Sequence, residues 1–206
     1  MGGRSVTLMI MATMLEAKPF VKGLSLKPYV KKPFPVFTTD NLVLVISGIG
    51  KAHAAAATAY GLLTFSPSAV INTGAAGALD GDHPAGSIYQ ISKIIEHDRP
   101  NILTGKPVRH KPDRIDGIDT AVLATGDRPV IDAKGRSRLS ALAQLVDMEA
   151  AAVVQTCRTM SAPCHVFKFV SDDPGHFSGA DIIFNIRKFR TNMFDFCRTA
   201  VLTRLG

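Results

Sequence analysis

The feature that most constrains the fold of this chain is the alternation of short, β-rich apolar segments with longer segments rich in alanine. A helical pattern is expected over 14–24, interrupted by Pro19, and over 51–65, 150–160 and the amphipathic stretch 179–204. Strands alternating with helices predict an α/β layered domain. The predicted strands, of which the second and third form a hairpin, are 5–12, 34–38, 42–46, 69–73, 86–98 (one strand or two), 120–127, 143–149 and 164–173.

Composition places the chain in a broad class before any motif is considered. With 206 residues, 46% hydrophobic and 20% charged, it is expected to form one soluble globular domain, residues 1–206. Its apolar runs are too short to span a membrane, and "VTLMIMA" near the N-terminus predicts a buried first strand rather than a signal peptide. The net charge of +7 comes from scattered residues without a nucleic-acid-binding motif, which favours a solvated basic surface.

Three cysteines are present, and none forms a C-x-x-C pair. A zinc ribbon or a thioredoxin-type site is therefore not expected. Cys157, Cys164 and Cys197 are instead expected to be small buried thiols of a protein in the reducing cytoplasm.

Small and polar residues gather where the predicted strands end. In open α/β sheets, ligands bind at the carboxyl ends of the strands, because small residues there let a ligand approach the backbone. This clustering predicts a binding site whatever the family. The residues concerned are Ser47-Gly48, Thr73-Gly74, Thr125-Gly126-Asp127, Asp147-Met148-Glu149 and Ser171-Asp172.

Two of these carboxylates, Asp147 and Glu149, lie in the otherwise apolar run "AQLVDMEAAAVVQ". Burying an ionised carboxylate without a partner is costly, so at least one of them is expected to serve a ligand. Glu149 is the harder one to explain by packing. Asp147 either shares its face or caps the helix that follows.

Several common motifs are absent. "GIGKAH" (48–53) has His53 where a dinucleotide fingerprint needs its third glycine, and "GAAGALDG" (74–81) lacks the Gly-Lys-Ser/Thr of a P-loop. No G-x-S-x-G is present, which argues against the serine nucleophile of an α/β-hydrolase. The six histidines show no metal-ligand spacing, and neither a metal nor another cofactor is expected. His97-Asp98 is interpreted as a structural strand-end turn, and 99–119 as a mobile loop or short hairpin.

Taken in order, seven motifs resemble the nucleoside phosphorylase/nucleosidase superfamily, and most closely its 5′-methylthioadenosine/S-adenosylhomocysteine nucleosidase branch. The motifs are "MATMLEA" (11–17), "SGIGKAHAAAAT" (47–58), "INTGAAGAL" (71–79), "GSIYQISKIIEHD" (86–98), "TGD" (125–127), "VDMEAAAV" (146–153) and "FVSDD" (169–173). The resemblance implies a three-layer α/β/α sandwich with a mixed central sheet. It also implies hydrolysis of the N-glycosidic bond of a 5′-substituted purine nucleoside, with release of the purine base.

The resemblance assigns the chemistry to three residues. Glu16 matches the glutamate that activates the attacking water, and Asp172 matches the aspartate that protonates the purine at N7, oriented by Ser171. These residue types suit the reaction, because cleavage passes through an oxocarbenium-like sugar and the base leaves poorly as an anion. A general acid such as Asp172 is typically worth about 10²–10⁴-fold in rate.

The same resemblance implies a set of substrate-binding residues. Ser47 falls in the turn that lies near the ribose and the water, Met148 matches the methionine packed against the sugar, and Glu149 matches the glutamate that accepts hydrogen bonds from the ribose hydroxyls. Gly74 ends a strand at the site. Val130 falls near the position where the nucleosidases place an aromatic residue against adenine.

The chain departs from the family pattern in three places. Asn72 replaces the arginine with which phosphorylases hold phosphate, which favours hydrolysis over phosphorolysis. Pro129 stands where the stacking aromatic is expected, and the segment after Asp98 is short and basic. The alternatives left open are a phosphorylase, a nucleosidase for a bulkier 5′-modified adenosine such as adenosylhopane, a futalosine hydrolase, and a nucleoside-binding protein without activity.

The partner expected from the resemblance is a second copy of the chain, in a homodimer or a higher homo-oligomer. The Ala-rich helix 51–65 and the apolar C-terminal segment are the expected interface. The other partners are the nucleoside and water, or phosphate in the alternative reaction.

Overall fold

A mixed β-sheet lies between two groups of helices in the computed structural model, which describes residues 5–174 and 178–205. Among these residues the strands are β1 Thr7–Met11, β2 Lys27–Val30, β3 Val36–Thr38, β4 Leu42–Ile46, β5 Ala69–Ala78, β6 Ile88–Pro100, β7 Pro107–His110, β8 Thr120–Thr125, β9 Leu145–Asp147 and β10 Cys164–Asp172. The helices are α1 Met14–Gly23, α2 Lys51–Phe65, α3 Ala133–Ser140, α4 Ala150–Thr159, α5 Gly179–Phe196, the π-helical turn η1 Cys197–Val201 and α6 Leu202–Leu205.

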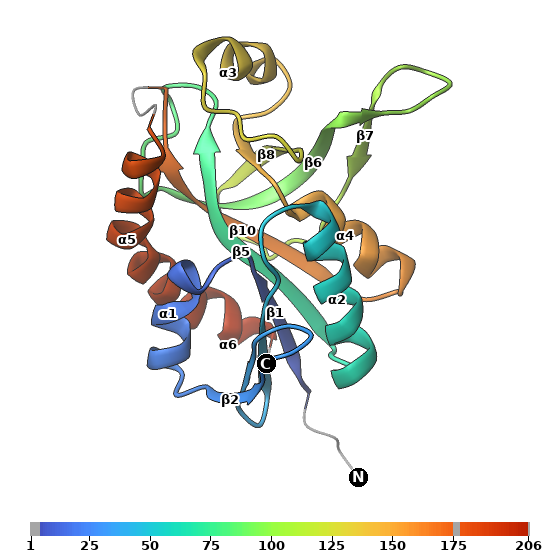
Figure 1. Cartoon of the computed structure of the whole chain (residues 1–206), viewed down its shortest axis with the longest axis vertical. Helices are drawn as coiled ribbons and strands as arrows, with labels where there is room; N and C mark the ends of the chain where they lie inside the picture. Colours follow the sequence, from blue (N-terminus) through green and yellow to red (C-terminus); the bar gives the residue numbers. More distant parts are fainter. Residues whose placement is uncertain (1–4, 175–177, 206) are drawn as a thin grey trace.

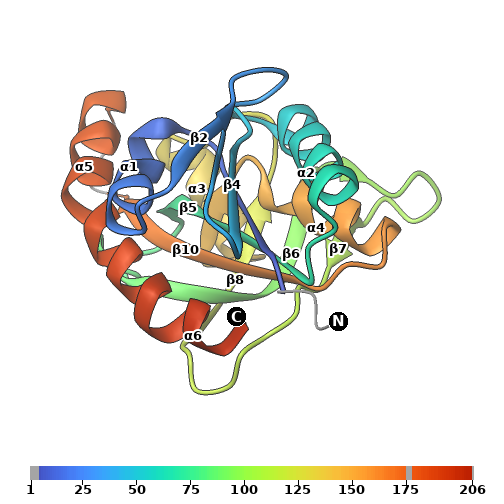
Figure 2. The ribbon, with the colours of Figure 1, turned by 90° about the horizontal axis from the view of Figure 1, so that it is seen from below.

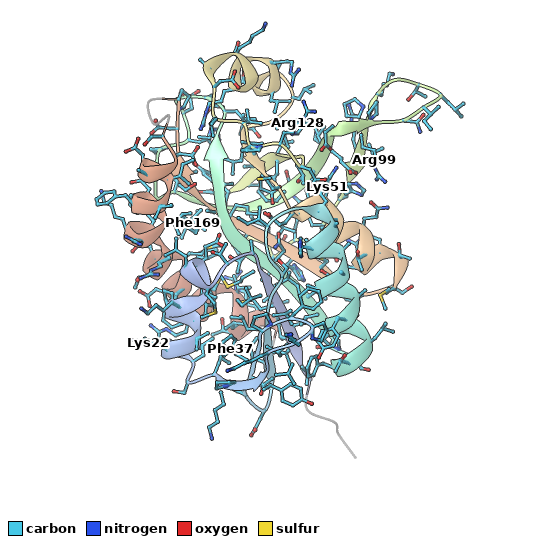
Figure 3. All side chains as sticks on the ribbon, in the orientation of Figure 1. Lys22, Phe37, Lys51, Arg99, Arg128 and Phe169 are labelled. Carbon is cyan, nitrogen blue, oxygen red and sulfur yellow. The ribbon has the colours of Figure 1, made fainter. Side chains whose placement is uncertain are left out.

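The three layers expected from the sequence are present. Figures 1 and 2 show α1, α5 and α6 on one side of the sheet and α2 and α4 on the other. Strand β1 is buried on both faces, so Leu8 and Ile10 join the core beneath α2 and α4, while Met9 and Met11 join the core beneath α1 and α5. Phe169 of β10 belongs to the second core and lies between the sheet and α5 (Figure 3).

The sheet contains two sets of parallel strands that run in opposite directions and meet at one site. Strands β1, β4, β5 and β10 are mutually parallel through their pairings, as are β6, β8 and β9. The two sets meet where β9 pairs antiparallel with the end of β5, and again where β10 pairs antiparallel with β6. Strands β5, β10, β6, β8 and β9 therefore form a closed ring of pairings. The carboxyl end of β9 consequently enters the site from the direction opposite to β5.

Helix α1 corrects one expectation. The sequence predicts an interruption at Pro19, yet α1 is continuous through it. Proline at this position removes the N–H that would bond to the carbonyl of Leu15, four residues earlier. Nη1 of Arg190 in α5 donates to that carbonyl oxygen at 2.6 Å. The vacated acceptor is thus satisfied by a neighbouring helix, which the local sequence does not reveal.

Most of the other predicted elements are confirmed, and two elements were not predicted. The hairpin of β3 and β4, helix α2 and the long C-terminal helix lie where the pattern places them. Segment 99–119 contains a hairpin, because β7 pairs antiparallel with β6. The unpredicted elements are β2 and α3. Strand β2 is largely exposed, and α3 buries only Arg136 and Leu139, so neither has a clear apolar period.

Burial of the thiols also agrees with the sequence. Cys157, Cys164 and Cys197 are free and buried. Within the described ranges, no helix has the length and apolar character needed to cross a membrane.

Candidate active site

A cavity of about 190 Å³ opens where the ends of β1, β5, β9 and β10 meet. It is smaller than the roughly 300–1,000 Å³ typical of small-molecule sites, and its rim is open, since Ile49 is 57% exposed. A ligand can therefore extend beyond the enclosed volume. The cavity is lined by Ala12, Thr13, Glu16, Ile49, Ala75, Ala76, Gly77, Arg128, Pro129, Val130, Ile131, Val146, Asp147, Met148, Glu149, Ser171, Asp172, Ile182 and Ile186.

Glu16 is held in the first turn of α1 by a capping box. Its Oε2 accepts hydrogen bonds from the backbone N–H of Thr13 at 3.1 Å and from the Thr13 hydroxyl at 2.6 Å. Its Oε1 accepts from the backbone N–H of Ala75 at 2.8 Å. A Cβ at Gly74 would lie 2.6 Å from Oε1, so only glycine lets the carboxylate approach β5 this closely. Glu16 is thereby buried and oriented by backbone and hydroxyl donors.

Glu149 is the residue directly before α4, and it lines the cavity. Its Oε1 accepts from the backbone N–H of Gly50 at 2.8 Å. Burial and the neighbouring charge of Asp147 raise the pKa of Glu149 from 4.5 to about 7, against the opposing attraction of Lys168. A carboxylate with this pKa changes its charge near neutrality, and a ligand that donates hydrogen bonds to it favours the ionised form.

Asp147 has a different role from Glu149, although only two residues separate them. Its Oδ2 lies 2.8 Å from Nζ of Lys168 and accepts from the backbone N–H of Ala150 at 2.9 Å. Its Oδ1 accepts from the hydroxyl of Thr125 at 2.5 Å. Asp147 touches the cavity, but its oxygens hold the start of α4 and neutralise a buried lysine. Of the two readings left open by the sequence, helix capping is the one that these contacts describe.

Lys168 is a buried cation beside Asp147 and Glu149. It is only 2% exposed, in the middle of β10, and the charges of Asp147, Glu149 and Glu16 raise its pKa against the opposing effect of burial. A lysine within the apolar run "CHVFKFVSD" is the signal by which the sequence could have revealed it, because a buried lysine needs a carboxylate partner.

Asp172 lies at the end of β10, at the other end of the cavity. Its Oδ1 accepts from the hydroxyl of Ser171 at 2.6 Å, and its Oδ2 accepts from Nη2 of Arg136. A Cβ at Gly77 would lie 2.8 Å from Oδ2, so the bare backbone of β5 makes room for this carboxyl group. Arg136 was not predicted, because α3 is mostly polar and offers no apolar pattern around it.

The remaining predicted residues divide into two groups. Met148 and Val130 line the cavity, as do Pro129 and Arg128 of the same segment after β8; Arg128 is marked in Figure 3. Ser47 does not line it: its hydroxyl donates to the carbonyl of Gly48 at 2.8 Å, within its own turn. Gly74 does not line it either and instead contacts Glu16.

Helix α5 contributes two residues that the sequence did not suggest. Ile182 and Ile186 line the cavity and provide an apolar wall opposite the sheet. Their helical spacing fits the core-facing pattern of the C-terminal segment, so nothing in the sequence separates them from packing residues.

A second group of charges lies outside the cavity, at the start of α2. Nζ of Lys51 lies 2.9 Å from Glu96 Oε1 and 2.6 Å from Asp98 Oδ1, and Glu96 Oε2 lies 2.8 Å from Arg99. Figure 3 marks Lys51 and Arg99 beside the β6–β7 hairpin. His97 lies within β6 rather than in a turn, which corrects the earlier interpretation, and burial lowers its pKa. Across residues 5–174 and 178–205, no cluster of side chains could hold a metal ion.

Comparisons with known proteins agree on one family. The family model described as the phosphorylase superfamily matches residues 8–202. A 5′-methylthioadenosine/S-adenosylhomocysteine nucleosidase of Chromohalobacter salexigens is 30% identical over 193 residues, covering 81% of each chain.

Solved structures agree on the fold. A nucleosidase of the same name from Helicobacter pylori, in complex with butyl-thio-DADMe-Immucillin-A, has a TM-score of 0.83 at 20% identity and covers 95% of this chain and 97% of its own. A futalosine hydrolase mutant from Helicobacter pylori has a TM-score of 0.82 at 19% identity, covering 94% and 97%.

Proposed function

Because the chain belongs to the phosphorylase superfamily, we propose that its cavity is the active site of a purine nucleosidase. The enzyme hydrolyses the N-glycosidic bond of a 5′-substituted purine nucleoside and releases the purine base. The observation that carries this function is the convergence of Glu16, Glu149 and Asp172, from three distant segments, on one cavity. The relative of 30% identity, named as a nucleosidase for methylthioadenosine and S-adenosylhomocysteine, supports the same reaction.

The sugar is held and attacked at the end of the cavity that carries Glu16 and Glu149. Glu149 in its ionised form accepts hydrogen bonds from the ribose hydroxyls, and its charge favours the cationic sugar that develops in the transition state. Met148 packs against the sugar. Glu16 has further acceptor capacity beyond its bonds to Thr13 and Ala75, and it takes a proton from the attacking water.

The base leaves at the end of the cavity that carries Asp172. Proton transfer from the Asp172 carboxyl group to the base neutralises the leaving group as the bond to the sugar breaks. The Ser171 hydroxyl contacts Oδ1 of this carboxyl group and orients it. Pro129 and Val130 provide an apolar wall for the base in place of an aromatic side chain.

Hydrolysis is favoured over phosphorolysis by the charges around the cavity. Among the described residues that line it, Arg128 is the one cation, and it lies on an exposed segment after β8. Asn72, at the position of the phosphorylase arginine, is buried and donates to the carbonyl of Ile10. Phosphate is an anion at neutral pH and would lie close to two carboxylates here, whereas water carries no charge.

The 5′ substituent is expected to be apolar where it leaves the ribose. Ile49, Ile131, Ile182 and Ile186 lie around the cavity, and the open rim leaves room for a bulky group. Methylthioadenosine and adenosylhomocysteine fit this description. A second candidate is a nucleosidase for a bulkier 5′-modified nucleoside, which the open rim and the similarity to a futalosine hydrolase favour.

We also propose that the enzyme is a cytoplasmic homodimer. The β6–β7 hairpin ends in Ile102 and Leu103, which are 99% and 93% exposed, and Leu63 of α2 is 75% exposed. Ile102 and Leu103 are adjacent, and apolar side chains exposed together are candidates for a surface that another chain covers. The three buried free thiols fit a reducing compartment. Sedimentation of the purified chain measures the assembly, and a monomer at micromolar concentration would contradict it.

A substrate panel tests the reaction. Purified protein is incubated with methylthioadenosine, adenosylhomocysteine, adenosine, inosine and a bulky 5′-modified adenosine, each with and without phosphate, and free base is measured by chromatography. We expect base release without phosphate from the 5′-substituted nucleosides. Strict dependence on phosphate would identify a phosphorylase, and binding without any base release would identify an inactive nucleoside-binding protein.

A further inference from the structure

Arg136 is a buried charge that the assigned roles leave unexplained. It is 1% exposed, on a short helix whose other residues are mostly exposed. Its Nη1 donates to the carbonyl oxygen of Ala78 in β5, and its Nη2 donates to Oδ2 of Asp172. Its Nε has no partner among the described residues. Arginine is rarely this buried unless it is paired, and its charged partner here is the proposed general acid.

The helix that carries Arg136 is continuous with one wall of the cavity. Segment 128–131 lines the cavity, and α3 follows directly, with Asp132 as its cap accepting from the backbone N–H of Gly135 at 2.8 Å. Figure 1 shows α3 beyond the carboxyl end of β5. Leu139, one turn after Arg136, is also buried and anchors the helix. Arg136 therefore reaches Asp172 from a helix that is anchored by a buried side chain.

Both oxygens of Asp172 are held by side-chain donors. The Ser171 hydroxyl binds Oδ1 at 2.6 Å, and the guanidinium of Arg136 binds Oδ2. The second contact joins a full positive charge to a carboxyl group in a buried site, where charge-assisted hydrogen bonds are strong. The guanidinium is itself held by its second bond, to the carbonyl oxygen of Ala78.

We propose that Arg136 is a positioning residue for protonation of the leaving base, acting through Asp172. It fixes the direction of the carboxyl group and compensates the negative charge that the group acquires on losing its proton. In this step the proton is carried by Oδ1, the oxygen that Arg136 does not contact, while the Ser171 hydroxyl donates to the carbonyl oxygen of Ala76, 3.3 Å away. The O–H bond of Asp172 breaks and an N–H bond forms on the base. The electrons of the broken sugar–base bond stay with the base, and solvent later returns a proton to Asp172. The proposal rests on the nucleosidase function above.

The decisive test compares two leaving groups. A purine needs the proton, whereas 4-nitrophenol leaves a riboside as a stable phenolate without one. In Arg136→Met we expect kcat/KM for methylthioadenosine to fall about 100-fold, in the range of lost general-acid catalysis. We expect kcat/KM for 4-nitrophenyl β-ribofuranoside to stay within a factor of about three of wild type. A residue that only holds the fold together would lower both values equally.

Two variants control for damage to the helix. Arg138, two residues later on α3, is exposed, so Arg138→Met should leave both substrates at wild-type rates. Arg136→Lys keeps a positive charge but cannot hold Ala78 and Asp172 with a planar fork. It should lower kcat for methylthioadenosine with little change in KM. If thermal melting shows that Arg136→Met does not fold, Arg136→Lys replaces it in the test. We then expect the same difference between the two substrates, with a smaller loss of kcat/KM for methylthioadenosine.

The possible outcomes separate this proposal from the function beneath it. Equal losses on both substrates, or a wild-type kcat for the nucleoside in Arg136→Lys, would overturn the role of Arg136 and leave the nucleosidase function intact. If the riboside is not a substrate of the wild type, a raised KM with unchanged kcat in Arg136→Lys would overturn it as well. No base release by the wild-type enzyme from any nucleoside would instead contradict the proposed function itself.

Discussion

The two ends of the cavity hold their buried carboxylates in different ways. At the end proposed to bind the sugar, Glu16 and Glu149 accept hydrogen bonds from backbone N–H groups of Ala75 and Gly50. At the base end, Asp172 contacts a full positive charge on a buried arginine. Backbone donors orient a carboxylate without neutralising it, which suits groups that must attract a cationic sugar. A guanidinium suits a group that becomes negative during the reaction.

Asp147 and Glu149 show the same difference over a distance of two residues. Asp147 is paired with Lys168 and bonded to the start of α4, so its charge is used within the protein. Among residues 5–174 and 178–205, Glu149 accepts a hydrogen bond only from the N–H of Gly50, which leaves it available for the ligand that we propose. Within one segment, therefore, the partner of a buried carboxylate distinguishes a structural role from a functional one.

The largest expected effect distinguishes the two ends by their chemistry. Asp172→Asn should lower kcat/KM for methylthioadenosine by about 10²–10⁴-fold and spare 4-nitrophenyl riboside, because only the purine needs a proton. Glu16→Gln should lower kcat/KM for both substrates by a similar factor, because water must attack the sugar in either case. Steady-state kinetics of the two variants on the two substrates measure the difference.

Circular dichroism of both variants serves as the control for folding. If Asp172→Asn lost both substrates equally, base protonation would not be its role. If Glu16→Gln spared the riboside, activation of water would have to be assigned to another residue.

The next largest effect concerns stability at the structural carboxylate. Lys168→Met leaves Asp147 buried without its cation, and removing one partner of a buried pair typically costs about 3–5 kcal/mol. Urea unfolding measures the change in the free energy of unfolding. Lys93→Met is a matched control on β6, because Lys93 is an exposed strand lysine. A loss no greater than that of the control would show that the pair contributes nothing to stability.

A pH-dependent effect is expected at Glu149. Its pKa is raised from 4.5 to about 7, so the native state binds more protons than the unfolded state in this window, and stability is lost as pH rises from about 4.5 to about 7. Glu149→Gln cannot ionise and avoids this loss. The variant should therefore be more stable than wild type by about 1–3 kcal/mol at pH 8, with the difference vanishing near pH 4.

Urea unfolding of both proteins at the two pH values measures this difference. An equal difference at pH 4 and pH 8 would contradict a raised pKa. Activity should change in the opposite direction, since the variant loses the charge that we propose binds the ribose hydroxyls.

The smallest expected effect is at Thr13, which caps α1 and donates to Glu16. Thr13→Ala should cost about 1 kcal/mol of stability, as is usual for a lost cap. It should also lower kcat several-fold, because Glu16 loses one of its fixed bonds. Ser178→Ala removes the comparable cap of α5 and provides the control, with a similar loss of stability and an unchanged kcat. Unchanged kcat in both variants would show that the cap does not position Glu16.

Much of the fold could be predicted because its elements have strong local patterns. Helix α2 begins and ends where the Ala-rich pattern places it, and β1 was recognised as a buried strand from a continuous apolar run. Strand β2 and helix α3 were missed because one is largely exposed and the other mostly polar. The interruption predicted at Pro19 is wrong because the donor that compensates for it, Arg190, lies far away in the sequence.

The candidate site was predicted in part, for a related reason. Glu16, Met148, Glu149 and Asp172 occur in short motifs whose order is readable, and they line one cavity. Ser47 occurs in an equally readable motif but bonds to its own turn. The orientation of a side chain depends on its neighbours in space, and the motif does not contain them.

By itself, the sequence determined the kinds of element, their order, and the polar residues at the strand ends, because these follow from local periodicity and residue type. Only the tertiary structure decided that β9 meets β5 from the opposite direction, that Lys168 neutralises Asp147, and that Arg136 reaches Asp172. The physical reason is that the cost of a buried charge depends on which partner lies beside it. Chain topology, rather than any local pattern, brings those partners together.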